Sequence, residues 1–228
     1  MLRGMNQQAR QAAMLLAGAF VLLVAFVSLK DKALPSSGGL LTTKDGQTVD
    51  VTGEARAAGF TYDPGVTAAD RVWIEAAIAK VRPEAAALIA EVDGLVTVRP
   101  MATGSAGGAI GLASGGPGGF TVDLDLTRLN NDLVMERAVA VVHELGHIVD
   151  FALVDDATLA RFDAGIPRGG GCGLAVNCDQ PAERFADTFA KWALRGAMSV
   201  GSGYGVPMPA SIEGWGEPLG ALSASLPK

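Results

Sequence analysis

The chain is poor in the side chains that most often bind metals or act as catalysts. Its 228 residues include two histidines, two cysteines and two tyrosines. Basic residues are also in the minority, with 18 Lys and Arg against 24 Asp and Glu, which gives a net charge of −6. This charge argues against nucleic acids and anionic lipid surfaces as partners, because both recruit proteins through clustered basic side chains. No internal repeat is apparent, and the hydrophobic content of 49% is enough to bury one good core.

Both histidines lie in one pentapeptide, His143-Glu144-Leu145-Gly146-His147. Residues four apart in an α-helix project from the same face, one turn above the other. Two neutral imidazoles at that spacing can bind one Zn²⁺, and a glutamate beside the first can act on a metal-bound water molecule. The alternative is a pair of helix histidines that only form hydrogen bonds. A second zinc site on the two cysteines is not expected, because no further histidine or cysteine is left to complete it.

A second pattern follows at Pro181 to Ala190, where the apolar spacing predicts a helix that begins at the proline. Glu183 and Asp187 are four residues apart and therefore share a face of this helix. A catalytic zinc ion usually has three protein ligands, and a carboxylate is a common third. A metal-bound imidazole also needs an acceptor for its other N–H group, which Asp187 could supply. The alternative is two surface carboxylates on an amphipathic helix.

Together, the two patterns resemble those of the gluzincin metallopeptidases, the superfamily that includes thermolysin. The strings HELGHIVD and ERFADTFA are most similar to the lethal-factor-like peptidases and, more loosely, to the compact ImmA/IrrE-type peptidases. The resemblance covers about 80 residues, from the strand near Phe120 to the helix ending near Arg195. It implies one Zn²⁺ ion, a peptide or protein substrate, and the following roles: His143, His147 and Glu183 as zinc ligands, Glu144 as catalytic base, and Asp187 as the supporting carboxylate.

The group that stabilises the oxyanion is less clear from the sequence. Families of this kind usually supply a Tyr or His, but there is no third histidine and residues 173–180 contain no tyrosine. Tyr204, in a glycine-rich stretch, is the candidate by elimination, because Tyr62 precedes every other site residue. The alternatives are a main-chain N–H, Arg195 or the zinc ion alone, with Tyr204 an ordinary loop aromatic. Asp150 shares a helix face with His147 and is expected to support the site or to cap the helix end.

The N-terminal region contains a long apolar segment. Ala12 to Leu29 are eighteen uncharged residues flanked by basic ones, which span about 27 Å as a helix, just enough to cross a bilayer. A cleavable signal peptide is the alternative, but its apolar region is usually shorter and precedes an A-x-A-like site, whereas Lys30-Asp31-Lys32-Ala33 follows here. We therefore predict a single-pass anchor in residues 1–32 and a linker in residues 33–59.

The cysteines bear on which side of the membrane the remaining domain faces. The basic residues on the two sides of the apolar segment are nearly balanced, so they do not decide the orientation. Cys172 and Cys178 lie six residues apart in a glycine-rich loop and could form a small disulfide, which would suit an oxidising compartment. Two free thiols are the alternative. We predict the disulfide and an extracytoplasmic domain.

Residues 60–228 are expected to form one α+β domain of the zincin type, with a small sheet packed on the zinc-binding helix. Periodicity alone supports only mixed α and β. The expected helices span Thr67–Val92, divided or kinked at Pro83, then Asn130–Leu153, Asp156–Asp163 and Pro181–Arg195, with a short one at most in Ala210–Ser225; the expected strands span Leu95–Arg99, Ala109–Ala113 and Phe120–Leu126.

The strand before the zinc helix forms the rim of the cleft in peptidases of this class. The resemblance therefore implies that Phe120 to Leu126 pairs with an extended substrate, with Phe120, Val122 and Asp123 as binding residues. An ordinary edge strand is the alternative. The function we predict is a membrane-anchored zinc endopeptidase that attacks peptide bonds with a Glu144-activated water molecule. A catalytically idle, zincin-like binding or assembly protein at the cell envelope is the second hypothesis.

Overall fold

The computed structural model describes residues 40–42, 48–50, 59–116, 118–169, 179–195 and 205–226. All of them belong to one of the two compact units of the chain, Asp31–Lys228. The predicted anchor at Ala12 to Leu29 lies outside the described residues. Within the described ranges, every helix is too short or too polar to span a bilayer.

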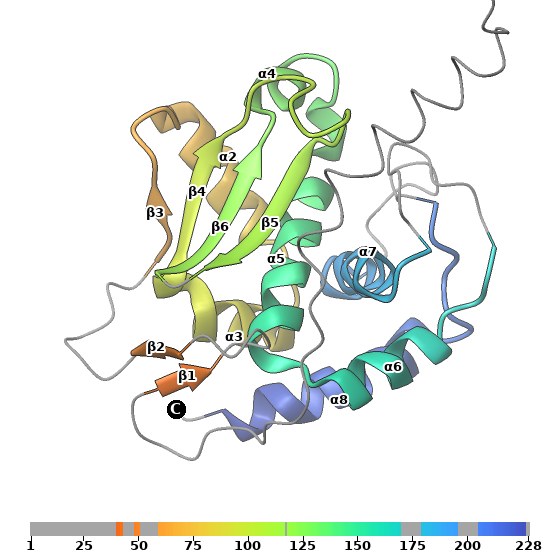
Figure 1. Ribbon diagram of the computed structural model, residues 1–228. Helices are drawn as coiled ribbons and strands as arrows, with labels where there is room; N and C mark the ends of the chain where they lie inside the picture. The colour runs from red at the N-terminus through yellow and green to blue at the C-terminus, as the bar shows by residue number, and fades with distance from the viewer. Residues whose placement is uncertain are drawn as a thin grey trace, which may run out of the picture. The chain divides into compact units, whose positions relative to one another are not determined.

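A mixed sheet of four strands forms one layer of the domain (Figure 1). In spatial order its strands are β3 (Thr61–Tyr62), β4 (Val96–Pro100), β6 (Gly119–Leu124) and β5 (Gly111–Gly116). The first three run parallel, and β5 is antiparallel to β6 in a hairpin whose register pairs Gly111 with Leu124. A separate antiparallel pair consists of β1 (Leu40–Thr42) and β2 (Thr48–Asp50).

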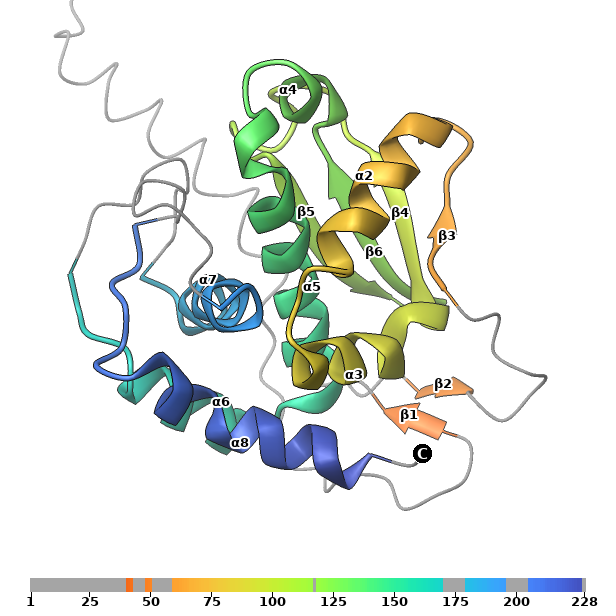
Figure 2. The ribbon, with the colours of Figure 1, turned by 180° about the vertical axis from the view of Figure 1, so that it is seen from behind.

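Seven α-helices are described, and two of them lie on one face of the sheet (Figures 1 and 2). They are α2 (Ala68–Ile78), α3 (Pro83–Val92), α4 (Leu126–Asn130), α5 (Arg137–Leu153), α6 (Asp156–Ala164), α7 (Pro181–Ala193) and α8 (Ile212–Ser225). Helices α2 and α5 lie on the sheet, and α3 packs against α5 at the end of the sheet. Helix α5 also packs against α7 on its other side. Helix α7 in turn contacts α6 and α8. The α+β class predicted from the sequence is confirmed.

Local sequence signals explain where the helices begin. Thr67 caps α2 by accepting a hydrogen bond from the Asp70 main-chain N–H (3.1 Å), and the Asp70 carboxylate accepts one from the Thr67 N–H in return. Pro83 begins α3, so the predicted division of the first helix is confirmed. Helix α5 begins at Arg137, later than expected, because Asp125 caps the short helix α4 ahead of it.

The core lies between the sheet and the helices that cover it. Alternate residues of β4 and β6 point into it, which is why these strands show period-two hydrophobicity. Helix α5 is buried on nearly every side, as its continuous apolar sequence predicted. The main contributors are Val96, Val98, Phe120, Val122, Leu124, Val142, Leu145, Ile148 and Val149.

The expectation that Phe120 to Leu126 forms the rim of the cleft and pairs with an extended substrate is wrong. Strand β6 is paired on both sides, with β4 and with β5, so its main chain has no free edge for a substrate. Phe120 and Val122 are core residues with exposed fractions of 1%, and Asp123 accepts two hydrogen bonds from Arg99. The edge strand next to α5 is β5, because the chain turns back after it and inserts β6 between β5 and β4.

Candidate metal site

Helix α5 brings the two histidines together inside the domain. His143 and His147 are 2% and 7% exposed, and their Nε2 atoms lie 3.2 Å apart. The rings meet edge to face, with centroids 4.8 Å apart. Two ring nitrogens at this separation can share a hydrogen bond or bind one metal ion.

Helix α7 supplies the third group. One carboxylate oxygen of Glu183, Oε2, lies 3.3 Å from His143 Nε2 and 3.6 Å from His147 Nε2. Two ligands of a tetrahedral zinc ion, each about 2.0–2.1 Å from the metal, are about 3.3 Å apart. All three ligand pairs therefore have separations close to those that a tetrahedral ion requires. The three residues form a group that could hold a metal ion.

A glycine allows α5 and α7 to approach closely enough for this contact. A Cβ atom on Gly146 would lie 3.1 Å from the Ala186 Cα and 3.1 Å from the Phe189 ring. Such contacts are tighter than ordinary van der Waals packing. Gly146 lies between the two histidines in sequence, and Ala186 is one turn after Glu183. The close crossing of the helices therefore sits directly beside the candidate ligands.

Glu144 lies on the neighbouring side of α5, against strand β5. Its side chain is buried, and its carboxylate accepts a hydrogen bond from the Ala113 main-chain N–H. A Cβ atom on Gly111 would be 2.3 Å from Glu144 Oε1, so the glycine leaves the space that the carboxylate occupies. Burial raises the pKa of Glu144, although the adjacent histidines and the Ala113 hydrogen bond lower it in part.

The charges of the site favour a cation at its centre. Burial raises the pKa of Glu183, but hydrogen bonds with His143 and His147 more than offset this and leave it lowered. Burial lowers the pKa of His147, yet the Glu183 hydrogen bond and the charges of Glu144, Glu183 and Asp150 outweigh burial and raise it. Three carboxylates thus surround two imidazoles in a buried space, where a bound metal ion would supply the balancing positive charge.

The two predicted supporting carboxylates are both buried. Asp187 is fully inaccessible and accepts a hydrogen bond from Lys191, whose ammonium group also donates to the Val206 carbonyl. This connects the body of α7 to the segment ahead of α8. Asp150 is 1% exposed, so it does not cap a solvent-facing helix end as the second expectation had it. Its negative charge acts on His147.

Three predicted residues lie outside the described residues: Tyr204, Cys172 and Cys178. The oxyanion role and the disulfide therefore remain predictions. Two glycines that shape the site, Gly111 and Gly146, were not identified from the sequence. The signal for Gly146 was available, because an isolated glycine inside a strongly helical pattern often marks a close approach of another backbone. Gly111 gave no such signal, because its contact with the Glu144 carboxylate arises only when α5 packs against β5.

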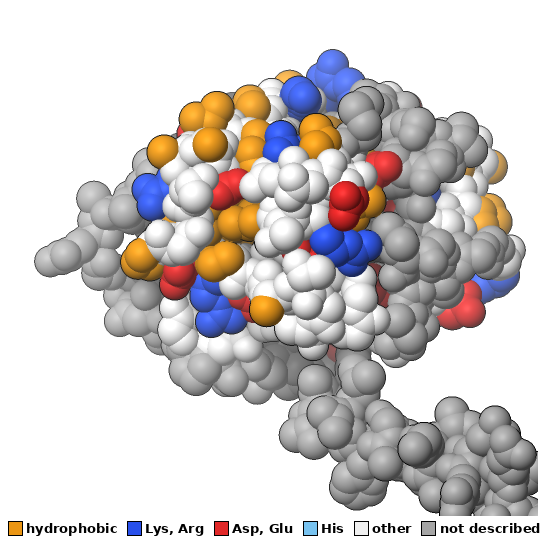
Figure 3. Space-filling view, turned by 90° about the horizontal axis from the view of Figure 1, so that it is seen from above, with side chains coloured by type: hydrophobic (Ala, Val, Ile, Leu, Met, Phe, Trp, Pro, Cys, Tyr) orange, Lys and Arg blue, Asp and Glu red, His pale blue; other side chains and the backbone are white. Residues whose placement is uncertain are grey.

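On the face of the molecule that Figure 3 shows, the charged side chains form no cluster of one sign that would suggest a second site. In Figure 3, seen from the end of the domain that carries α4, acidic and basic side chains are interspersed and no histidine is visible.

Comparison of the chain with protein-family models, with curated proteins and with solved structures finds no match in any of the three.

Proposed function

We propose that this chain is a zinc-dependent endopeptidase of the gluzincin type. The observation that carries the proposal is the buried His143, His147 and Glu183 group, with the Glu144 carboxylate on the same helix and against the sheet edge. Nitrogen and carboxylate donors in a three-ligand set are the choice of catalytic zinc sites, which leave a fourth position open. A purely structural site would have no use for a general base next to the metal, which is the role we give to Glu144.

The residues divide the work of peptide hydrolysis between them. A zinc ion held by the three ligands would supply Lewis acidity, lowering the pKa of a water molecule and polarising the scissile carbonyl. Glu144 takes the proton from the attacking water and delivers it to the leaving amine. Burial raises the pKa of this carboxyl group. The Ala113 N–H and the space at Gly111 hold the carboxylate in place.

Strand β5 is the element we assign to substrate binding in place of β6. Asp125 N donates to Ile110 O, and continuing this alternation along the hairpin points the main-chain groups of Gly111, Ala113 and Gly115 away from β6. The Ala113 N–H is bound by Glu144, which leaves the Ala113 carbonyl and the main-chain groups of the two glycines for a peptide. In the described part of the chain, no strand pairs with that side of β5. An extended peptide added there would lie beside Glu144, with main-chain hydrogen bonds for affinity and side-chain pockets for specificity.

The remaining parts of the proposal concern placement in the cell. The apolar segment Ala12 to Leu29 would anchor the enzyme, with the α+β domain on the extracytoplasmic side and Cys172 linked to Cys178.

Tyr204 is the candidate oxyanion donor. An idle binding protein at the cell envelope is the second candidate function, and the buried, oriented Glu144 favours the enzyme over it.

The test is a pair of measurements on the full-length chain with Glu144→Gln. We expect the variant to bind zinc at the same stoichiometry, while hydrolysis of a quenched-fluorescent peptide library falls by about 10² or more. The exposed Glu217→Gln is the matched control and should retain the wild-type rate. Wild-type hydrolysis by the Glu144 variant would refute the mechanism, and zinc binding without any hydrolysis by the wild type would favour the idle binding protein.

A further inference from the structure

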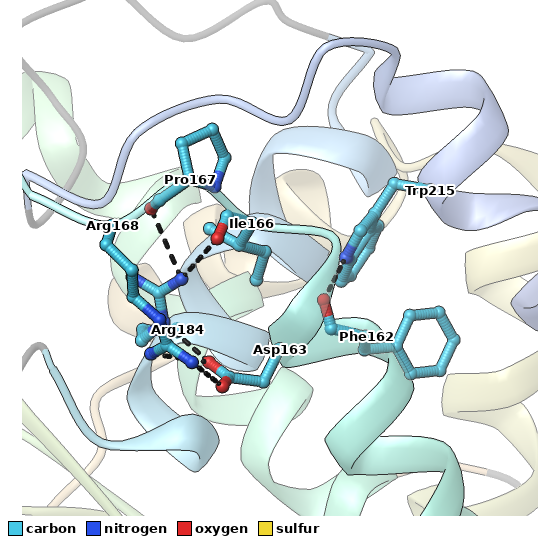
Figure 4. Close-up of polar contacts among 7 residues, drawn as sticks. All are labelled: Phe162, Asp163, Ile166, Pro167, Arg168, Arg184 and Trp215. Atoms are coloured by element: carbon cyan, nitrogen blue, oxygen red, sulfur yellow. Dashed lines mark hydrogen bonds and ion pairs between the residues drawn. The ribbon is translucent and has the colours of Figure 1, made fainter.

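The side chain next to the third ligand reaches a different part of the fold. Arg184 follows Glu183 on α7, and consecutive residues of a helix point about 100° apart. Glu183 therefore faces α5, while the Arg184 guanidinium extends towards α6 and the turn that follows it (Figure 4). Arg184 is 1% exposed, which makes it the largest fully buried side chain of the described residues.

Two nitrogens of this guanidinium, Nε and Nη2, donate hydrogen bonds to buried or main-chain acceptors. Its Nε lies 2.6 Å from Asp163 Oδ1, at the end of α6. Its Nη2 donates to the Ile166 carbonyl at 2.7 Å and to the Pro167 carbonyl at 3.2 Å. The planar, forked donor arrangement of arginine makes such a contact directional, because several bonds must be satisfied at once. Figure 4 shows Asp163, Ile166 and Pro167 placed around the guanidinium, with dashed lines to each.

The first turn of α7 lacks a side-chain cap. Its preceding residue, Gln180, makes no side-chain capping hydrogen bond, and Pro181 contributes no N–H. The turn carries Glu183 on one face and Arg184 on another. The contact of the guanidinium with α6 therefore restrains the rotation of this uncapped turn about the axis of α7, and with it the direction of the Glu183 carboxylate.

We infer that Arg184 is a positioning residue for the third metal ligand: through its buried pair with Asp163, it holds Glu183 towards His143 and His147. The inference rests on the proposed function in that it requires the three residues to bind a metal ion. It differs from a purely structural role, because it states that Arg184 acts on metal affinity through Glu183. A residue needed only for folding would lower stability and leave the affinity of the folded protein unchanged.

The test measures zinc affinity of the full-length chain by competition with a chelator, at a temperature where circular dichroism shows each variant folded. Arg184→Met should weaken zinc binding by about 10–100-fold, the range found when groups that orient metal ligands are removed. Arg168→Met is the matched control, because Arg168 pairs with the same Asp163 carboxylate but is 65% exposed. It should change the affinity less than about threefold, as expected for a solvated ion pair.

The decisive comparison repeats Arg184→Met in a Glu183→Ala background. If Arg184 acts through Glu183, it has nothing left to position there, and the further loss should be less than about threefold. If Arg184→Met alone fails to fold, the double variant Asp163→Leu/Arg184→Met replaces it, since removing both charges leaves neither buried and unpaired. The Co²⁺ form of either folded variant should show an altered visible spectrum, because the ligand geometry changes.

The outcomes separate this inference from the proposed function. Wild-type zinc affinity in a folded Arg184 variant would overturn the inference alone, as would an equal loss with and without Glu183. A wild-type chain that binds no zinc would overturn the proposed function, and the inference with it.

Discussion

At the scale of single residues, the site depends on an absence of side chain. Gly111 belongs to the edge strand β5, and the Glu144 carboxylate occupies the position that a Cβ atom there would need. Gly115, four residues further along β5 and on the same face, has only ordinary contacts of 3.6 Å with Phe120. Of these two glycines in one strand, only Gly111 leaves space for the carboxylate of the candidate base.

Gly111→Ala should displace Glu144 while leaving the metal ligands in place. The added methyl group would lie 2.3 Å from Glu144 Oε1, so the carboxylate must move away from the position that Ala113 holds. We expect kcat to fall by about 10-fold or more, since proton transfer depends on sub-ångström placement. Zinc stoichiometry should be unchanged. Gly115→Ala is the control, and an equal loss of activity in the two variants would show that Gly111 has no particular connection with the base.

At the scale of secondary-structure elements, the site is formed where α7 crosses α5. In Figure 1, α7 is seen end-on whereas α5 runs along the picture, so the two helices meet over a short length. Gly146 and Ala186 lie at this contact, with residue Phe189 beside them. Small residues at a crossing bring backbones together, and here the closeness lets Glu183 reach two side chains of another helix.

Gly146→Ala should separate the two helices at the site. The new methyl group would need the Ala186 backbone or the Phe189 ring to shift by a few tenths of an ångström. Because overpacking in a well-filled core costs about 1–3 kcal/mol, we expect a lower melting temperature together with weaker zinc binding. Gly220→Ala in α8 meets no atom within 4 Å and serves as the control. It should bind zinc as the wild type does and be equally or more stable.

The start of α2 provides a pH-dependent contribution to stability. Asp70 accepts hydrogen bonds from Thr67, Trp73 and Asn130, and so connects α2 with α4. Burial raises the pKa of Asp70, but these hydrogen bonds outweigh it and lower the pKa below the usual value. A carboxyl group whose pKa is lowered by folding stabilises the protein above its unfolded pKa of about 3.9. That stability is lost as the pH falls through the lower, folded value.

Asp70→Asn should therefore cost the most stability at neutral pH. Several hydrogen bonds to a carboxylate are weakened, so we expect a loss of about 1–3 kcal/mol in the free energy of unfolding at pH 7. The difference between variant and wild type should stay constant down to about pH 4 and shrink below it. Urea denaturation at a series of pH values measures this. A difference that is independent of pH down to pH 2 would contradict the assigned charge of Asp70.

At the scale of the whole molecule, local sequence patterns predicted which helices and strands form. They did not predict which of these elements pack side by side. Pro83 divides the first helix as expected, and the histidine helix is buried as its apolar sequence indicated. The expected strand at Phe120 was found, but its place inside the sheet depends on which strands pair with it, and pairing is a tertiary property. Strand β3, with two residues, is too short to give a periodic signal.

For the candidate site too, the sequence predicted the local features and not the tertiary contacts. The convergence of His143, His147 and Glu183 was predicted from helical spacing in two separate segments, and the structure brings all three together. What could not be predicted was how the fold supports them. Gly111 and Arg184 act through contacts with residues distant in the sequence, and Arg184 looked like an ordinary charged residue of an amphipathic helix. Burial of that guanidinium is visible only when α6 and α7 are packed.

The most direct test of the central claim is the zinc coordination of the full-length chain, measured by X-ray absorption at the zinc edge. The account predicts one ion per chain with nitrogen and oxygen neighbours at about 2.0–2.1 Å, two of them imidazoles, and loss of this signal in His143→Ala. Sulfur neighbours at about 2.3 Å would place the metal on the cysteines instead. That result, or zinc that remains tightly bound in the His143 variant, would contradict the assignment.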